Sequence, residues 1–274
     1  MTAVALHPTH SRSRCRLALV SAGLLTLGAA ACTGGDPVSG PTAADGGGRA
    51  VGDIVVFAAA SLTDSFTGLA ADFETEHPGT RVVLNFGGSS ALAQQIVGGA
   101  PVDVFAAASP VTMARVTDAG LAAGEPSVLA RNRLEIAVPA GNPAGVTGLE
   151  DLADEDLTIA LCAEEVPCGA ASVRVFVAAG LTPAPDTYEQ DVRAALTKVT
   201  LGEVDAALVY RTDVRAAGDA VEGLDLPESG EGVTAYPLVL LEDAPNPAGA
   251  QAFVEYLLGD PGREALGAAG FELP

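Results

Sequence analysis

The sequence predicts an α/β protein of two lobes, each a mainly parallel sheet flanked by helices. Short apolar runs alternate with helical patterns along the chain after residue 50, and this alternation is typical of parallel sheets covered by helices. The strand-like runs fall into two groups. About 220 residues remain after the N-terminal region, which is enough for one large domain or two lobes.

The first group of elements covers residues 53–119. A turn at Pro78-Gly79 separates the first helix from the second strand. The expected elements are strands 53–58, 81–86 and 102–106 and helices 62–76, 91–97 and 110–119.

The second group begins after residue 131, and Gly180 is expected to cap one of its helices. Its expected elements are strands 134–139, 157–162 and 204–210 and helices 149–153, 170–179 and 192–201. A returning strand, 236–241, precedes two helices, 247–258 and 261–268, and each of these begins with a cap residue followed by Pro.

The lobes are expected to divide the chain at two crossings, one at 131–134 and one near Tyr236. The first lobe would then comprise 51–131 plus 238–274, and the second lobe 132–237. Two crossing segments make a two-strand hinge. Ligands of open α/β sheets bind at the carboxyl ends of strands, so facing lobes would form a cleft that closes on a ligand.

The N-terminus predicts export. Arg12, Arg14 and Arg16 precede an uncharged apolar run, 17–31, which is typical of a secretory signal peptide over 1–31. The small residues before Cys32 resemble a bacterial lipoprotein signal, which implies lipidation of Cys32; the alternative is a plain cleaved signal with a free Cys32. Residues 32–50 are rich in Gly, Pro, Ser and Thr and predict a flexible tether. We therefore expect a protein anchored by lipid to the extracytoplasmic face of the cell membrane.

The charge of the exported part argues against nucleic acid and anionic membrane surfaces as partners. Three of the 14 basic residues belong to the signal, which leaves 11 against 35 acidic residues, a net charge near −24. Exposed charges are screened beyond about 10 Å, so a closed pocket still responds to its local dipoles.

Two cysteines, Cys162 and Cys168, remain in the body of the exported chain. Export favours a disulfide between them, and the alternatives are a metal pair or a catalytic thiol. His77 is the one histidine outside the signal, so no zinc ligand set is visible. We expect neither a metal-ion site nor a cofactor.

Candidate binding residues recur where strands end and helices begin. Ser61 follows an apolar strand at a helix start, where unpaired backbone N–H groups can hold an anion. The turn at 86–90 places Gly-Gly before Ser89 and Ser90. Each feature alone is more typical of an ordinary helix cap.

Three further points follow the same pattern in the second group of strands. Cys168 lies in the turn that opens a helix, Val192 follows Asp191 at another helix start, and Tyr210 ends a strand, where its phenol can donate a hydrogen bond.

Taken together, these segments resemble the molybdate-binding proteins of ABC transporters from Val55 to Phe271. The segments 58–62, 100–105, 191–193 and 207–210 carry the likeness. The resemblance implies the two-lobed periplasmic-binding-protein fold of type II. It also implies a tetrahedral oxyanion, molybdate or tungstate, held by hydroxyls of Ser61, Ser89 and Tyr210 and by backbone amides, among them those of Cys168 and Val192. The implied partner is an ABC permease, and we expect a monomer.

Two departures from the family stand out. Cys168 lies where relatives often have Ala, and a disulfide there would shift a backbone donor. The Gly-Gly pair before Ser89 replaces a Ser that is common in relatives, which alters the pocket or removes a hydroxyl.

Two other functions compete with molybdate binding. A donor-only pocket equally suits sulfate, whereas monohydrogen phosphate keeps a proton and needs an acceptor. An envelope enzyme with Ser61 as nucleophile would need a nearby base. His77 lies about 20 Å along the same predicted helix, and no nucleophile elbow surrounds Ser61, so the sequence favours a binding protein without catalytic residues.

Overall fold

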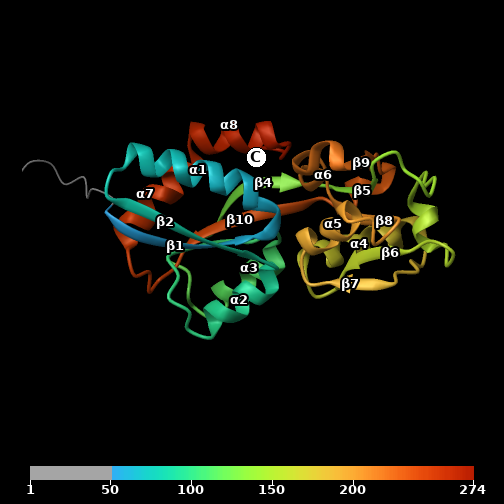
Figure 1. The fold of residues 1–274 in the computed structure, drawn as a ribbon. Helices are drawn as coiled ribbons and strands as arrows, with labels where there is room; N and C mark the ends of the chain where they lie inside the picture. The colour runs from blue at the N-terminus through green and yellow to red at the C-terminus, as the bar shows by residue number, and fades with distance from the viewer. Residues whose placement is uncertain (1–50) are drawn as a thin grey trace, which may run out of the picture. The chain divides into compact units, whose positions relative to one another are not determined.

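A computed structural model describes residues 51–274 (Figure 1). The predicted signal peptide 1–31, the lipidation of Cys32 and the tether 32–50 lie outside the described residues. Among residues 51–274, no helix is both long and apolar enough to cross a bilayer.

The first sheet has five strands in the order β2-β1-β3-β10-β4. β1 pairs in parallel with β2 and β3, whereas β10 runs antiparallel to both β3 and β4. β1, β2, β3 and β4 therefore point the same way, and β10 alone is reversed within this sheet. The bounds are β1 Gly52–Ala59, β2 Thr80–Gly87, β3 Val104–Ala106, β4 Ser127–Asn132 and β10 Thr234–Leu240.

The second sheet repeats this plan in the order β7-β6-β8-β5-β9. β6 pairs in parallel with β7 and β8, and β5 runs antiparallel to β8 and β9. Four of its five strands thus share a direction, as in the first sheet, which confirms two mainly parallel sheets. The bounds are β5 Leu134–Pro139, β6 Ile159–Cys162, β7 Thr187–Glu189, β8 Ala206–Tyr210 and β9 Val221–Leu224.

Helices cover both faces of the first sheet (Figure 1). Successive side chains of a strand point to opposite faces, and β1 follows this rule. Ile54, Val56 and Ala58 pack into one buried cluster with α1, α7 and α8, whereas Phe57 packs into another with α2 and α3. The bounds are α1 Thr63–Glu76, α2 Ser89–Val97, α3 Pro110–Thr117, α7 Pro247–Leu258 and α8 Asp260–Ala269.

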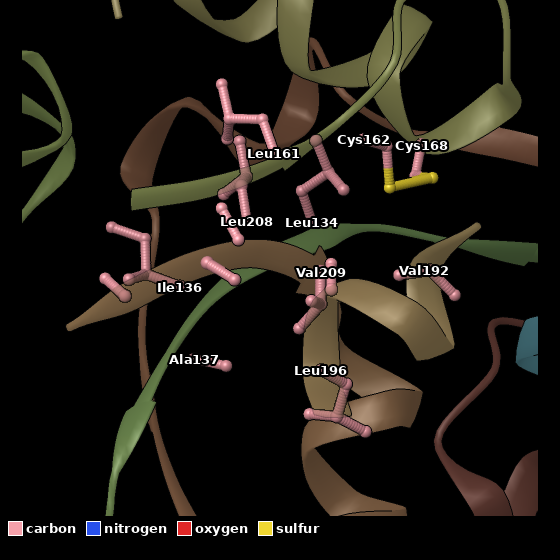
Figure 2. Packing of buried hydrophobic residues seen from close by; sticks show 14 of the residues in the cluster. Leu134, Ile136, Ala137, Leu161, Cys162, Cys168, Val192, Leu196, Leu208 and Val209 are labelled. Atoms are coloured by element: carbon pink, nitrogen blue, oxygen red, sulfur yellow. A yellow bond between two sulfur atoms is a disulfide. The ribbon is translucent and has the colours of Figure 1, made fainter. Parts of the chain in front are cut away.

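A single buried cluster fills the second sheet and its helices. β5 contributes Leu134 and Ile136, β8 contributes Leu208 and Val209, and the disulfide of Cys162 and Cys168 lies at its edge (Figure 2). The helices are α4 Pro167–Ala179, α5 Val192–Thr200 and α6 Arg211–Ala217. Gly180 adopts a left-handed conformation at the end of α4, as expected for a C-cap.

The chain passes between the sheets twice. β4 ends at Asn132 and β5 begins at Leu134, and β10 returns to the first sheet from Thr234 onward, paired with β4. The expected lobe boundary at 237/238 falls inside β10. We call the first sheet and its helices the first lobe, and the second sheet and its helices the second lobe.

Among the strands and α-helices of the described residues, four were not predicted, namely β4, β7, α6 and β9. β4, β7 and β9 are edge strands that carry polar or Gly residues and lack a clear alternation. α6 follows β8 directly, with Tyr210 as its N-cap and no intervening turn residue. Two predicted helices also begin earlier than expected, α2 at Ser89 and α4 at Pro167.

Candidate functional site: a small cavity between the lobes

One cavity gathers all five predicted binding residues. The carboxyl ends of β1, β2 and β8 and the starts of α2, α4 and α5 surround it. Its lining residues are Ala59, Ala60, Ser61, Gly87, Gly88, Ser89, Ala108, Val166, Pro167, Cys168, Asp191, Val192 and Tyr210.

The cavity is small. The volume open to the centre of a water molecule is about 20 Å³. This is slightly more than the roughly 10–15 Å³ that a cavity needs to hold one water. A sphere of that volume, widened by the radius of water, is roughly 3 Å in radius. Such a space fits one compact ion and excludes sugars and peptides.

The first lobe contributes two serine hydroxyls. Ser61 lies in the short 3-10 turn Ala60–Leu62 that leads into α1, and its Oγ lies 2.8 Å from the Tyr236 hydroxyl. Ser89 is the first residue of α2, and its Oγ accepts a hydrogen bond from the Ala108 amide at 3.0 Å. Both side chains are buried. The amides of a first helical turn have no acceptor within the helix, so the start of α2 adds N–H dipoles.

The second lobe contributes backbone amides. Cys168 follows Pro167 in the first turn of α4, and because proline has no N–H, Cys168 carries the first amide hydrogen of that helix. Asp191 caps α5 by accepting the amides of Arg193 and Ala194, at 2.9 and 3.0 Å. The Val192 amide therefore has no acceptor in its helix or cap.

The predicted disulfide between Cys162 and Cys168 is present. The two Cα atoms are 5.7 Å apart. It joins the end of β6 to the start of α4, and Gly169 packs so closely that an added Cβ would lie 1.9 Å from the Ala163 carbonyl oxygen. The loop that positions the Cys168 amide is thus fixed by a covalent bond and by a glycine contact.

Tyr210 contributes a phenolic hydroxyl to the cavity wall. The residue is 1% exposed, and its Oη makes no hydrogen bond of ordinary geometry to a described residue, although the Tyr236 hydroxyl is close enough to interact with it and to contribute to the raised pKa of Tyr210. Burial raises the pKa of Tyr210 well above its ordinary value, so the hydroxyl keeps its proton. A buried donor without a hydrogen bond of ordinary geometry is rare and indicates a place for a ligand atom.

No Lys or Arg is among the described residues that line this cavity. Arg193, next to Val192, forms ion pairs with Asp64 of α1 and with the buried Asp213, whose Oδ1 lies 3.1 Å from the Arg193 Nε. Burial raises the pKa of Asp213 to about 7, against the opposing effect of Arg193. Binding of an anion here would rest on neutral dipoles. Asp191 contributes a carboxylate to the lining.

The two lobes touch beside the cavity. An added Cβ on Gly88 would lie 2.3 Å from the Gln190 carbonyl oxygen, and the Ser90 hydroxyl donates to the Glu165 carbonyl at 2.6 Å. The ion pair between Arg193 and Asp64 also joins the lobes. A glycine at position 88 is required by this contact.

Sequence reasoning missed two polar residues behind the cavity. Tyr236 is fully buried against Ser61, and Asn132, 1% exposed, lies within 3.4 Å of the Tyr236 hydroxyl. Tyr236 lies at the start of a predicted strand and Asn132 lies between two arginines, so neither position suggested a role at a binding site. The one signal that could have identified them was a polar residue at a buried position.

A family model described as bacterial extracellular solute-binding protein matches residues 54–272. The chain belongs to the bacterial extracellular solute-binding proteins. Members of this family bind solutes rather than transform them, in agreement with the prediction that the chain is not an enzyme. The family is described as extracellular, which places its members outside the cytoplasm.

Individual relatives in this solute-binding family cover nearly all of the chain. The molybdate-binding protein ModA of Mycobacterium tuberculosis is 39% identical over 256 residues, which span 93% of this chain and 97% of that protein. ModA of Escherichia coli is 30% identical over 233 residues, covering 81% of this chain and 90% of that protein.

Solved structures share the fold. The periplasmic molybdate-binding protein of Azotobacter vinelandii superimposes with a TM-score of 0.69 at 22% identity, covering 81% of this chain and 99% of that chain. The sulfate-binding protein SubI of Mycobacterium tuberculosis gives 0.71 at 17% identity, covering 81% and 86%. These likenesses confirm the two-sheet α/β architecture of a solute-binding protein.

Proposed function

We propose that this chain captures molybdate, and with it tungstate, and delivers the anion to an ABC permease. The observation that carries the proposal is the small cavity at which the hydroxyls of Ser61, Ser89 and Tyr210 meet the amides of three helix starts, with the Tyr210 hydroxyl making no hydrogen bond of ordinary geometry. Relatives named molybdate-binding that align along most of the chain support the choice of anion.

In this proposal each of the five residues donates a hydrogen bond to the bound oxyanion. Ser61 and Ser89 donate through their hydroxyls and first-turn amides, Cys168 and Val192 donate backbone N–H groups, and Tyr210 donates its phenol. Molybdate carries no proton near neutral pH, so a set of donors satisfies its oxygens. Neutral dipoles suffice because helix starts favour negative charge.

Capture couples to movement of the lobes. We assign residues 51–131 plus 238–274 to one moving body and residues 132–237 to the other, with the 131–134 and Tyr236 segments as the hinge. The oxyanion bridges donors of both bodies, so it stabilises the closed form over the open form. Docking of the closed form on the permease and reopening would release the anion.

The proposed setting is the outer face of the cell membrane. The predicted signal over 1–31 directs export, and lipidation of Cys32 would hold a monomer near its permease on the tether 32–50.

The first test is isothermal titration calorimetry of residues 33–274 with molybdate, tungstate, sulfate and phosphate. We expect one-to-one binding of molybdate and tungstate, with sulfate and phosphate much weaker. Binding of sulfate alone would replace the assigned anion, and heat from none of the four would overturn the oxyanion site.

The variant Tyr210→Phe tests the observation that carries the proposal. It removes a buried donor that makes no hydrogen bond of ordinary geometry, so the ligand-free protein should be as stable as wild type or more stable. Molybdate affinity should fall about 10- to 100-fold. Loss of stability without loss of affinity, measured by thermal unfolding and calorimetry, would contradict a ligand contact.

A further inference from the structure

A buried chain of polar groups runs from the second lobe through the hinge to the cavity. The Asn132 amide nitrogen donates to the Thr212 hydroxyl at 2.8 Å and to the Tyr236 hydroxyl at 3.4 Å. The Tyr236 hydroxyl in turn lies 2.8 Å from Ser61 Oγ. All four side chains are buried, and the Tyr210 hydroxyl is a further polar neighbour of the Tyr236 hydroxyl.

The Asn132 amide favours one direction for the hydrogen bonds in this chain. The Asn132 Oδ1 accepts the Arg133 amide at 3.0 Å, which orients the NH₂ group of Asn132 toward Tyr236. An NH₂ group only donates, so the Tyr236 oxygen accepts, and its single hydrogen can be donated to the Ser61 Oγ 2.8 Å away. Ser61 Oγ then accepts, and its own hydrogen is free to point into the cavity.

The other hydroxyls of the cavity have the same polarity. The Ser89 Oγ accepts from the Ala108 amide, which leaves the Ser89 hydrogen for a ligand. Burial raises the pKa values of both Tyr210 and Tyr236, so both phenols keep their hydrogens. The carboxylate that lines the cavity, Asp191, already accepts two amides at its Oδ1.

We propose that Asn132 and Tyr236 are positioning residues that fix the Ser61 hydroxyl as a donor, so that the cavity selects oxyanions without a proton. This inference rests on the proposed function and adds the residues behind its selectivity. Monohydrogen phosphate brings an O–H that needs an acceptor, and a hydroxyl already committed to donating offers it poorly. Molybdate has only acceptors and satisfies every donor.

The substitution Asn132→Asp tests this chain of hydrogen bonds by reversing its direction. A carboxylate at position 132 still accepts the Arg133 amide, but it also accepts from Tyr236, which then accepts from Ser61. The Ser61 lone pairs would face the cavity. The added negative charge opposes both anions, but only molybdate also loses a donor. We therefore expect molybdate affinity to fall about 100-fold and phosphate affinity to fall less, so that the ratio of the two affinities decreases.

The substitution Tyr236→Phe provides a second test that adds no charge. It leaves Ser61 free to rotate, and we expect molybdate affinity to fall about 10-fold with a smaller or no fall for phosphate. Tyr256→Phe on α7 is the matched control, because Tyr256 packs against Phe73 away from the cavity, and it should change neither affinity.

Titrations of residues 33–274, with phosphate measured by displacement, separate the outcomes. A lower ratio of molybdate to phosphate affinity in both variants, with unchanged thermal unfolding in at least one, supports the inference. An equal fall of both affinities would assign the residues a merely structural role and overturn it. A wild-type chain that binds no molybdate would instead overturn the proposed function, and this inference with it.

Discussion

The two lobes contribute different mixtures of hydrogen-bond donors to the same cavity. The first lobe presents two serine hydroxyls beside helix-start amides, and these hydroxyls rotate and are directed by acceptance from Tyr236 and the Ala108 amide. The second lobe presents one phenol, that of Tyr210, and the amides of Cys168 and Val192, whose directions are fixed by their helices. A rotating hydroxyl donor is therefore oriented by a second hydrogen-bonding group, whereas a backbone donor is oriented by the rigid loop or helix that carries it.

The largest fall in molybdate affinity should come from a substitution that keeps the two lobes apart. Gly88→Ala places a methyl group 2.3 Å from the Gln190 carbonyl oxygen of the other lobe, and a backbone atom cannot move aside cheaply. Closure would be blocked while each lobe stays folded, so molybdate affinity should fall about 100-fold or more with little change in thermal unfolding.

Gly68→Ala is the control for this prediction. Gly68 is an exposed residue of α1 outside the cavity lining, and an added Cβ there meets no atom within 4 Å, so calorimetry should give near wild-type affinity. Equal behaviour of the two alanine variants would contradict a role for the Gly88 contact in closure.

The second-lobe amides can be tested with a pair of substitutions at Val192. Proline is well tolerated at the first position of a helix, and Asp191 has the extended backbone that precedes proline. Val192→Pro removes the N–H and should lower molybdate affinity about 10- to 100-fold. Val192→Ala keeps the N–H, so it should retain affinity despite a loss of about 1–2 kcal/mol in the free energy of unfolding.

A smaller fall in molybdate affinity is expected when the disulfide that stiffens the loop of the Cys168 amide is removed. Replacing Cys162 and Cys168 together with alanine removes a cross-link over a short loop, which is worth about 2 kcal/mol in the free energy of unfolding. The Cys168 amide remains, so affinity should fall only severalfold. Urea unfolding and calorimetry would check both, and a collapse of affinity at unchanged stability would contradict this order of effects.

The smallest expected effect is a pH dependence from Asp213, behind Tyr210. Burial raises the pKa of its carboxyl from 3.8 to about 7. Between these values the folded state holds a proton that the unfolded state has lost. Stability from this group therefore rises as pH falls from 7 toward 4 and is lowest above 7.

Asp213→Asn removes this titration. Urea unfolding at pH 5 and pH 7.5 should show wild type gaining stability relative to the variant at the lower pH, by about 1 kcal/mol per pH unit at most. Parallel pH profiles of the two proteins would mean that Arg193 keeps the carboxyl ionised throughout.

The sequence predicted most of the fold because the buried strands carry their own signal. β1, β5 and β8 are apolar runs bounded by Gly, Pro or polar residues, and their ends placed Ser61 and Tyr210 correctly at the cavity edge. The edge strands β4 and β9 carry polar residues, so hydrogen bonding to a neighbour, rather than composition, makes them strands.

The hydrogen-bonded chain of Asn132, Tyr236 and Ser61 was not predictable, because it depends on the register of paired strands. β10 pairs with β4 so that Tyr236 lies opposite Ala130 and Thr234 opposite Asn132, and a shift by one residue would turn these side chains to the other face. The contact between Gly88 and Gln190 likewise depends on how two lobes meet, which no local pattern encodes.

The position of β10 in the first sheet also constrains the order of folding. β10 lies between β3 and β4, yet it follows the whole second sheet in the chain. In a chain that becomes available from its N-terminus, the second sheet is complete once β9 has appeared, whereas β4 has no neighbour in its sheet until β10 arrives. Contacts of such large sequence separation form slowly. The lobe that begins the chain is therefore the one that finishes folding last.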